Sequence, residues 1–290
     1  MLNNPKDHHY LPQFLLRAWA GCDGKIERFT QPRPGKLDVR RVYPSEAGFQ
    51  RNLYAAPPGV NPSFDAERDF FQKLDSAAAL AHAKLLRLEK PDAQDRYSWA
   101  AFVLSLFHRT PEHLKATTAL LDAMWDRVDD SQGRYEAIRQ AGDPLTIQEY
   151  LLRLDPNIRA RSSFASLLRS IESSPLVNFL SRITWGVIDV SAAARSLLLS
   201  DNPVMLAPLA KPLGHIAMPI GPTRLFVATV DLETGKSIRR LGDNQLTRNS
   251  NAAVVQHATA TVIADNRRQA PYIARHFGTK PIGSLATGFK

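Results

Sequence analysis

The fold class is indicated most clearly by residues 215–230, which read His-Ile-Ala-Met-Pro-Ile-Gly-Pro-Thr-Arg-Leu-Phe-Val-Ala-Thr-Val. Two β-rich runs, residues 215–220 and 223–230, are joined here through Gly221-Pro222, a dipeptide that is typical of a turn. The second run is apolar over most of its length, which is expected of a strand that is covered on both faces. These residues therefore predict a central strand over residues 223–230.

Other short β-rich runs lie toward both ends of the chain, and helical periodicity fills the middle. Strands are expected over residues 25–30, 37–43, 184–190, 196–199, 215–220, 223–230 and 259–264, with 52–54 extending the N-terminal pair. Helices are expected over residues 14–20, 63–88, 94–109, 112–129, 145–154, 163–173 and 244–258. A helix break is expected at residues 130–133, and a charged hairpin turn at residues 231–236. The pattern predicts an α+β fold, with a mixed or antiparallel sheet built from N-terminal and C-terminal strands and a large central helical region.

The chain has 290 residues, which is enough to bury a full core. We expect a single α+β domain over residues 1–290, in which residues 63–180 form a helical subdomain inserted between the β-rich ends. The segment Pro57–Pro62 holds three prolines and a glycine, so it is the clearest linker in the sequence.

The composition is that of a globular protein, with 44% hydrophobic residues and a net charge of +9. No apolar run approaches the roughly 20 residues that span a bilayer, and the N-terminus lacks a signal-peptide pattern. We therefore expect a cytoplasmic protein with no membrane partner. The single cysteine, Cys22, excludes an intrachain disulfide. The positive charge favours nucleic acid as a partner, although the basic residues are spread along the chain.

Polar groups are concentrated at Lys6–Trp19, where His8, His9, Tyr10 and Gln13 precede an apolar helical run. Neutral imidazole can ligate a metal or act as a base near pH 7, and Gln13 can orient a substrate or water. Neighbouring side chains of an extended segment point to opposite faces, so only one histidine faces a site easily, and we favour His8. The alternative is that both imidazoles cap the following helix or bond to backbone carbonyls.

Further blocks of sequence carry a family resemblance. They are residues 24–29, 49–54, Glu67 at the head of a helix, 107–111, 199–204, 218–220 and 249–251. Together with Lys6–Trp19 they resemble, in order and spacing, a bacterial family of unknown function, the domain-of-unknown-function family 4238 (DUF4238). The resemblance covers nearly the whole chain and implies little about activity. His108 stands where that family commonly has glutamine, so the resemblance assigns it no role.

Arg109 falls at the edge of the apolar stripe of its helix, beside Phe102. An arginine against a core stays protonated, so it requires a carboxylate or a bound anion. Pro111 lacks an N–H, so the backbone is expected to kink at this point and expose hydrogen-bond acceptors. A purely structural pair between Arg109 and a carboxylate is the alternative.

Asp201 and Asn202 follow the β-rich run 196–199 in the order Ser-Asp-Asn-Pro. Side chains at strand ends reach clefts, and Pro203 keeps Asn202 extended. The alternative for Asp201 is an Asx-turn, in which the carboxylate bonds its own backbone. Glu67 lies in a first helical turn, where the helix dipole alone favours an acidic residue.

The leading hypothesis is a phosphodiesterase or nuclease-like hydrolase that acts on nucleic acid. Its catalytic residues are expected to be His8, His9, Gln13, Arg109 and Asp201, and its substrate-binding residues Tyr10, Thr110, Asn202 and Asn251. A divalent metal ion, Mg²⁺ or Mn²⁺, is expected on Asp201, Glu67 and His8, with Arg109 neutralising phosphate charge. Two alternatives stay open: a non-enzymatic module that binds an anionic ligand or a partner protein of a defence or toxin-type system, and a small-molecule hydrolase.

Overall fold

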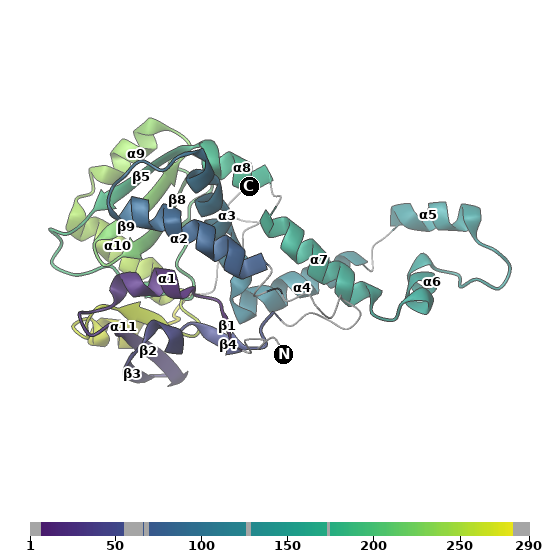
Figure 1. Cartoon of the computed structure of the whole chain (residues 1–290), viewed down its shortest axis with the longest axis horizontal. Helices are drawn as coiled ribbons and strands as arrows, with labels where there is room; N and C mark the ends of the chain where they lie inside the picture. Colours follow the sequence, from purple (N-terminus) through teal and green to yellow (C-terminus); the bar gives the residue numbers. More distant parts are fainter. Residues whose placement is uncertain (1–6, 55–65, 67–69, 126–128, 173–174, 281–290) are drawn as a thin grey trace.

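The computed structural model describes residues 7–54, 66, 70–125, 129–172 and 175–280. Within these residues all strand pairs are antiparallel, in two four-stranded sheets and one two-stranded sheet. Helices surround the sheets, and some of them extend away from the strands (Figure 1). The α+β prediction is therefore confirmed.

The first sheet joins the two ends of the chain, in the order β3-β2-β10-β6. Its strands are β2 (Ile26–Arg33), β3 (Lys36–Val42), β6 (Leu199–Ser200) and β10 (Val262–Ala264). Phe29 of β2 faces Val262 of β10, and both side chains are buried. This pairing confirms that N-terminal and C-terminal strands share a sheet.

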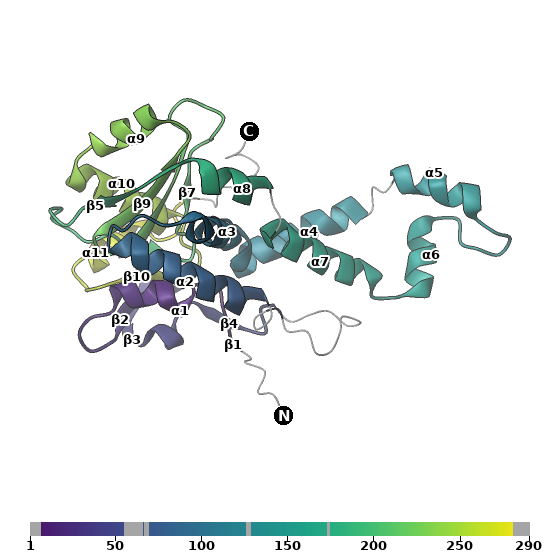
Figure 2. The ribbon, with the colours of Figure 1, turned by 45° about the horizontal axis from the view of Figure 1, so that its top comes forward.

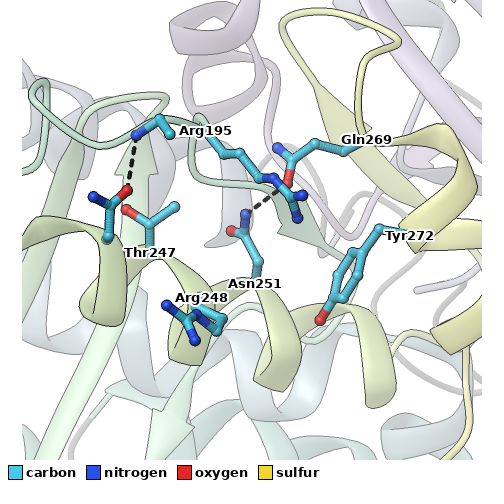
Figure 3. Close-up of a pocket in the computed structure, with 8 residues that line it drawn as sticks. Arg195, Thr247, Arg248, Asn251, Gln269 and Tyr272 are labelled. Atoms are coloured by element: carbon cyan, nitrogen blue, oxygen red, sulfur yellow. Dashed lines mark hydrogen bonds between the residues drawn. The ribbon is translucent and has the colours of Figure 1, made fainter.

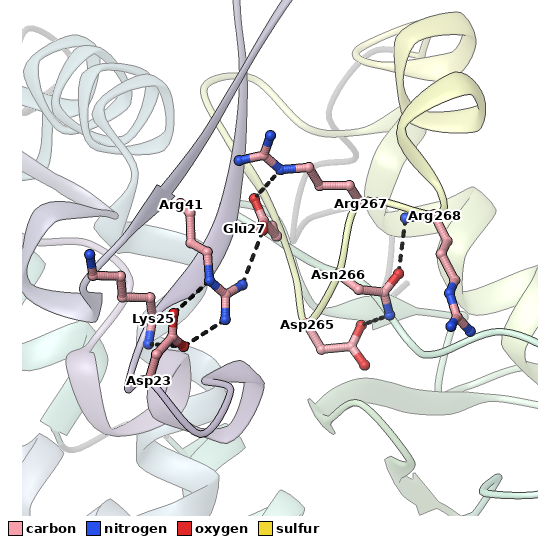
Figure 4. A network of polar contacts seen from close by, with 8 residues as sticks. All are labelled: Asp23, Lys25, Glu27, Arg41, Asp265, Asn266, Arg267 and Arg268. Atoms are coloured by element: carbon pink, nitrogen blue, oxygen red, sulfur yellow. Dashed lines mark hydrogen bonds and ion pairs between the residues drawn. The ribbon is translucent and has the colours of Figure 1, made fainter.

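An ion-pair network reinforces the same sheet (Figure 4). The carboxylate of Glu27, a buried residue of β2, accepts a hydrogen bond from Arg41 at 3.0 Å and another from Arg267 at 2.9 Å. Arg41 also binds Asp23 through two hydrogen bonds of 2.6 and 2.7 Å. Because Arg41 lies on β3 and Arg267 follows β10, Glu27 links the strands on both of its sides.

The second sheet has the order β5-β9-β8-β7. Its strands are β5 (Thr184–Asp189), β7 (Met205–Leu206), β8 (His215–Gly221) and β9 (Arg224–Thr229). β9 pairs with β5 on one side and with β8 on the other, and its residues Leu225 to Thr229 are all buried. The expected central strand over residues 223–230 is therefore present. The register of β8 against β9 shifts between Pro219 and Gly221, where proline provides no N–H for the ladder.

One hydrophobic core connects the N-terminus, the central helices and the second sheet. It includes Leu15, Trp19, Leu85, Trp99 and Phe226, all essentially inaccessible to solvent. The Trp19 indole N–H donates to the Leu197 carbonyl at 2.9 Å, so its one polar atom is satisfied. This core places α2 (Gln72–Leu86) and α3 (Ala93–Arg109) directly against the N-terminal helix.

The remaining helices cover the sheets or form an extension. They are α1 (Gln13–Leu16), η1 (Arg17–Trp19), η2 (Pro44–Glu46), α4 (Pro111–Trp125), α5 (Asp129–Ile138), α6 (Ile147–Leu154), α7 (Ile158–Glu172), α8 (Pro175–Arg182), α9 (Leu232–Arg239), α10 (Asp243–Gln256) and α11 (Ala270–His276). Figure 2 shows α4 and α7 leading away from the sheets, with α5 and α6 at the far end. The division into an inserted helical subdomain over 63–180 stays a prediction, and α2 and α3 pack into the same core as the strands.

Three sequence-based expectations were wrong. Residues 52–54 form a turn, and the strand in this region is β4 (Phe49–Arg51), which pairs with β1 (Asp7–His9). Gly133 lies inside α5, because a single glycine costs a helix only about 1 kcal/mol. Residues 231–236 begin α9, with the Asp231 carboxylate accepting the Thr234 backbone N–H at 2.7 Å as an N-cap. The linker Pro57–Pro62 lies outside the described residues.

Candidate functional site

His8 lies on β1, opposite Gln50 of β4, and its side chain is buried. Its Nδ1 accepts the backbone N–H of Tyr54 at 2.8 Å, and its ring stacks on the Tyr54 ring at 5.6 Å. The Tyr54 hydroxyl in turn donates to the Arg109 carbonyl at 2.9 Å. His8 therefore connects the N-terminal strand to the C-terminal end of α3.

Arg109 is fully buried at the end of α3. Its guanidinium donates two hydrogen bonds to Asp75 of α2, at 2.6 and 3.0 Å, and one to the Ser105 hydroxyl at 2.9 Å. It also lies 4.7 Å from the Phe71 ring centroid. The carboxylate that the sequence required for Arg109 is thus supplied by Asp75, a residue that the sequence did not single out.

His9 faces the opposite side of β1 from His8, as the alternation of an extended strand requires. Burial lowers the pKa of His9 below 6.5, while a hydrogen bond with the Ser45 backbone and the charges of Asp7 and Asp75 oppose this effect. Its Nε2 is shielded from solvent and has no hydrogen-bond partner among the described residues. Such a group is rare, because a buried polar atom without a partner costs about 1–3 kcal/mol.

Asp75 carries the complementary charge. Burial raises its pKa above 3.8, and the Arg109 guanidinium and His9 oppose that rise. Its side chain retains 17% exposure, whereas the Arg109 side chain has none. His9 interacts electrostatically with Asp75, and Asp75 binds Arg109, so the three residues form a charged group in which the His9 Nε2 has no hydrogen-bond partner among the residues that the structure describes.

Asp201 is buried at the end of β6. Its carboxylate accepts the backbone N–H groups of Thr259, Ala260 and Thr261, at 3.0 to 3.3 Å, and the Thr259 hydroxyl. Burial raises the pKa of Asp201, and these hydrogen bonds oppose the rise. The carboxylate therefore holds the loop before β10, and the structure shows no Asx-turn in which it bonds its own backbone.

The junction between α3 and α4 links Asp201 to the N-terminal strand. Glu112 accepts the Thr259 hydroxyl at 3.3 Å, and burial together with Asp201 and Glu112 raises the pKa of Tyr10. Thr110 is buried at the same junction, where its hydroxyl accepts the His113 backbone N–H at 3.3 Å. Six sequence-predicted residues thus gather around this junction, in what we call the junction cluster: His8, His9, Tyr10, Arg109, Thr110 and Asp201.

The other predicted residues lie elsewhere. Gln13 accepts a hydrogen bond of 3.4 Å from Arg17 at the start of η1, and Asn202 donates to the His257 carbonyl at 2.9 Å. Asn251 lies on α10, where it bonds Leu198, Ser196 and Gln269. Glu67 lies outside the described residues, so the metal set of Asp201, Glu67 and His8 stays a prediction. Within the described ranges, no three histidine, cysteine or acidic side chains are grouped to hold a metal ion.

The sequence analysis assigned no role to two further polar residues of the junction, His108 and His113. Burial lowers the pKa of His108 to about 4 and also lowers that of His113, and neither Nδ1 has a hydrogen-bond partner among the described residues. The run Arg109-Thr110-Pro111-Glu112 was the available signal, because a helix that restarts at a proline exposes polar side chains on both sides of the break.

A cavity of about 540 Å³ opens beside the junction cluster. Tyr54 and Phe71, which contact His8 and Arg109, form one wall, and residues of α4, α6 and α7 form the others. The lining is mainly apolar, with Asp122 and Arg159 among its polar residues. This volume falls in the range of pockets that hold small molecules, roughly 300–1,000 Å³.

Comparison with known proteins identifies the family but no activity. Neither curated proteins nor solved structures gave a match to this chain. No helix in the described part of the chain is long and apolar enough to cross a membrane. The family model described as "Protein of unknown function (DUF4238)" matches residues 7–268, a range that includes the whole junction cluster, and the chain therefore belongs to the DUF4238 family.

Proposed function

We propose that this protein is a hydrolase in which His9 transfers the proton, with phosphodiesters of nucleic acid as its substrate class. The observation that carries the proposal is the Nε2 of His9, which is shielded from solvent and has no hydrogen-bond partner in the described part of the chain, together with the electrostatic interaction between His9 and Asp75. The net charge of +9 supports a polyanionic substrate.

In this proposal the neutral His9 imidazole accepts a proton from the attacking water through Nε2. The water oxygen forms a bond to phosphorus, the bond to the leaving alkoxide breaks, and that alkoxide takes a proton from the imidazolium. The negative charge of Asp75 stabilises the imidazolium, because an opposite charge favours the ionised form of a histidine. His9 returns to its neutral state after each turnover.

Arg109 has a different role from the one that the sequence indicated. Since its guanidinium is fully buried and bonded to Asp75, it positions that carboxylate and leaves phosphate contact to other residues. Asp201 likewise acts through the loop 259–261, which its hydrogen bonds hold in place. Whether hydrolysis requires a divalent ion, Mg²⁺ or Mn²⁺, is tested by adding each ion or a chelator to the assay.

A small-molecule hydrolase is the second candidate, and the apolar cavity of about 540 Å³ favours it. An apolar wall suits the uncharged part of a small ester better than it suits the backbone of a nucleic acid. In this case the substrate lies against Tyr54 and Phe71, which contact His8 and Arg109.

The test is hydrolysis of single- and double-stranded DNA and RNA, and of bis(p-nitrophenyl) phosphate, with Mg²⁺, with Mn²⁺ and with a chelator. His9→Gln should reduce the rate at least about 100-fold, since general acid–base catalysis contributes roughly 10²–10⁴-fold. The matched control is His215→Gln, because His215 lies on the second sheet and its side chain bonds the Leu213 carbonyl of the preceding loop.

The pH profile gives a second readout. Because burial lowers the pKa of His9, kcat/KM should rise with pH and level off below pH 6.5. A His9→Gln variant with the wild-type rate would overturn the role of His9. Cleavage of chromogenic esters without cleavage of any nucleic acid would select the second candidate.

A further inference from the structure

A second cavity, of about 360 Å³, lies on the C-terminal side of the molecule and is separate in its lining from the junction cluster. It is formed by the loop before β6, one face of α10 and the start of α11 (Figure 3). We call it the α10 pocket. Its lining residues are Ala194, Arg195, Asn244, Thr247, Arg248, Asn251, Gln269 and Tyr272.

The floor of the α10 pocket is held together by hydrogen bonds between side-chain amides and the backbone. Asn251 accepts the Leu198 N–H at 2.8 Å and donates to the Ser196 carbonyl at 2.9 Å and to Gln269 at 3.1 Å. Gln269 also donates to the Ser196 carbonyl at 2.9 Å. Both amides are buried and satisfied, so they hold three segments together and give the pocket a preformed base.

Thr247 is different from these amides. It is only 2% exposed, it lines the pocket, and its hydroxyl has no hydrogen-bond partner among the described residues. A buried hydroxyl normally finds a partner, because leaving it unsatisfied costs about 1–3 kcal/mol. The hydroxyl of Thr247 is therefore available to donate to a ligand in the pocket.

Two arginines stand at the rim. Figure 3 shows the Arg195 guanidinium reaching over Asn251 toward Gln269 and Tyr272, with Arg248 on the α10 side. Both residues are exposed, and within the described part of the chain neither has an ion-pair partner. The carboxylate of Asp265, which accepts the Ser196 hydroxyl at 2.9 Å, does not line the pocket. The rim of the pocket is thus positively charged.

We infer that the α10 pocket binds the phosphate monoester group of a small molecule of nucleotide or sugar-phosphate size. Arg195 and Arg248 would bind the phosphate oxygens from the rim, because guanidinium groups match phosphate with paired hydrogen bonds. Thr247 donates to the ligand from the floor, and the Tyr272 ring offers a flat wall for the organic part. The cavity volume of about 360 Å³ suits a ligand of this size and excludes a folded nucleic acid.

The inference is independent of the hydrolase proposal, since no residue of the junction cluster lines the α10 pocket. Occupation of the pocket would fix the loop at Ala194–Arg195 against α10, a contact already made by the Ala194 N–H and the Asn244 side chain at 2.9 Å. Ligand binding is therefore expected to stabilise the C-terminal part of the fold.

Isothermal titration calorimetry of the full-length chain tests the inference with three probes: inorganic phosphate, adenosine monophosphate and adenosine. We expect the monophosphate to bind, inorganic phosphate to bind more weakly and adenosine not to bind. Arg195→Gln should weaken binding of the monophosphate about tenfold or more, since a charged hydrogen bond contributes about 1.5–3 kcal/mol. Thr247→Val, which preserves shape, should weaken it about fivefold.

Arg139→Gln is the matched control, because Arg139 is an exposed arginine directly after α5, on the far extension. It should bind like the wild type, as should His9→Gln. Equal binding by Arg195→Gln, Thr247→Val and the wild type would overturn the inference, and so would equal binding of adenosine and its monophosphate. Absence of binding by all three probes at millimolar concentration would also overturn it for this ligand class.

Discussion

Replacing Arg109 by methionine is expected to destabilise the folded chain by about 3 kcal/mol at pH 7. The variant loses two hydrogen bonds to Asp75, at 2.6 and 3.0 Å, and one to Ser105 at 2.9 Å. Removing one partner of a buried ion pair costs about 3–5 kcal/mol, because the other charge stays buried without compensation. Asp75 keeps 17% exposure, so water can reach it and the low end of this range applies.

The pH dependence of this deficit distinguishes an ion pair from simple loss of packing. Burial already raises the folded-state pKa of Asp75 above its unfolded value, and loss of the guanidinium raises it further. An acid whose folded pKa is raised destabilises the folded state when it is ionised. The loss of folding stability in Arg109→Met should therefore be largest at high pH and should become smaller as the pH falls toward 5.

Urea unfolding followed by tryptophan fluorescence at pH 8, 7, 6 and 5 measures the effect. The control is Arg40→Met, because Arg40 forms a pair with Asp38 in which the side chains are 65% and 37% exposed. Exposed pairs contribute about 0–1 kcal/mol, so this variant should unfold almost like the wild type at every pH. A loss in Arg109→Met no larger than in Arg40→Met, or a deficit that grows as the pH falls, would refute the reasoning.

Three other changes probe separate parts of the fold. Asp201→Asn should cost about 2–3 kcal/mol and speed amide hydrogen exchange at 259–261, because a neutral amide accepts fewer hydrogen bonds than the buried carboxylate; unchanged exchange would contradict it. Burial lowers the pKa of His82 from 6.5 to about 4, so stability is lost as the pH falls through this window. Between pH 7 and 4 the wild type should lose about 3 kcal/mol more than His82→Gln in urea unfolding. Gly48→Ala should lower the melting temperature more than Gly35→Ala does. Both glycines have a positive φ, +66° at Gly48 and +76° at Gly35, so alanine is strained at either position. Only at Gly48 would the new Cβ also meet a side chain, that of Leu11 at 2.6 Å.

Local patterns predicted much of the fold. The apolar run at residues 223–230 was read correctly as a central strand, because strands covered on both faces need apolar side chains at every position. Asp231 is a residue type that commonly caps a helix N-terminus, and its carboxylate does accept the Thr234 N–H. The charged residues at 231–236 were instead interpreted as a hairpin turn. The low helix propensity of Gly133 predicted a break, but α5 continues through this residue.

The site depends on pairings that a single sequence does not reveal. Arg109 at the edge of an apolar stripe correctly implied a carboxylate, but its identity as Asp75 depends on how α2 packs on α3. His8 was favoured over His9 because an extended strand puts the two side chains on opposite faces; the structure buries His8 more deeply, and which of them takes part in a reaction stays a prediction. The polar groups of the α10 pocket come from three segments, so only the tertiary fold brings Arg195 and Thr247 together.

The pairing of β2 with β10 affects how the chain can fold during its synthesis. β3 protects one edge of β2 as soon as both have left the ribosome, but Phe29 must wait for Val262 before its other edge is paired. At about 5–20 residues per second, that interval is on the order of ten seconds or longer. An unpaired strand edge is a template for wrong association. The nascent chain is therefore exposed to aggregation until β10 emerges, and a truncation before residue 262 would leave that edge open permanently.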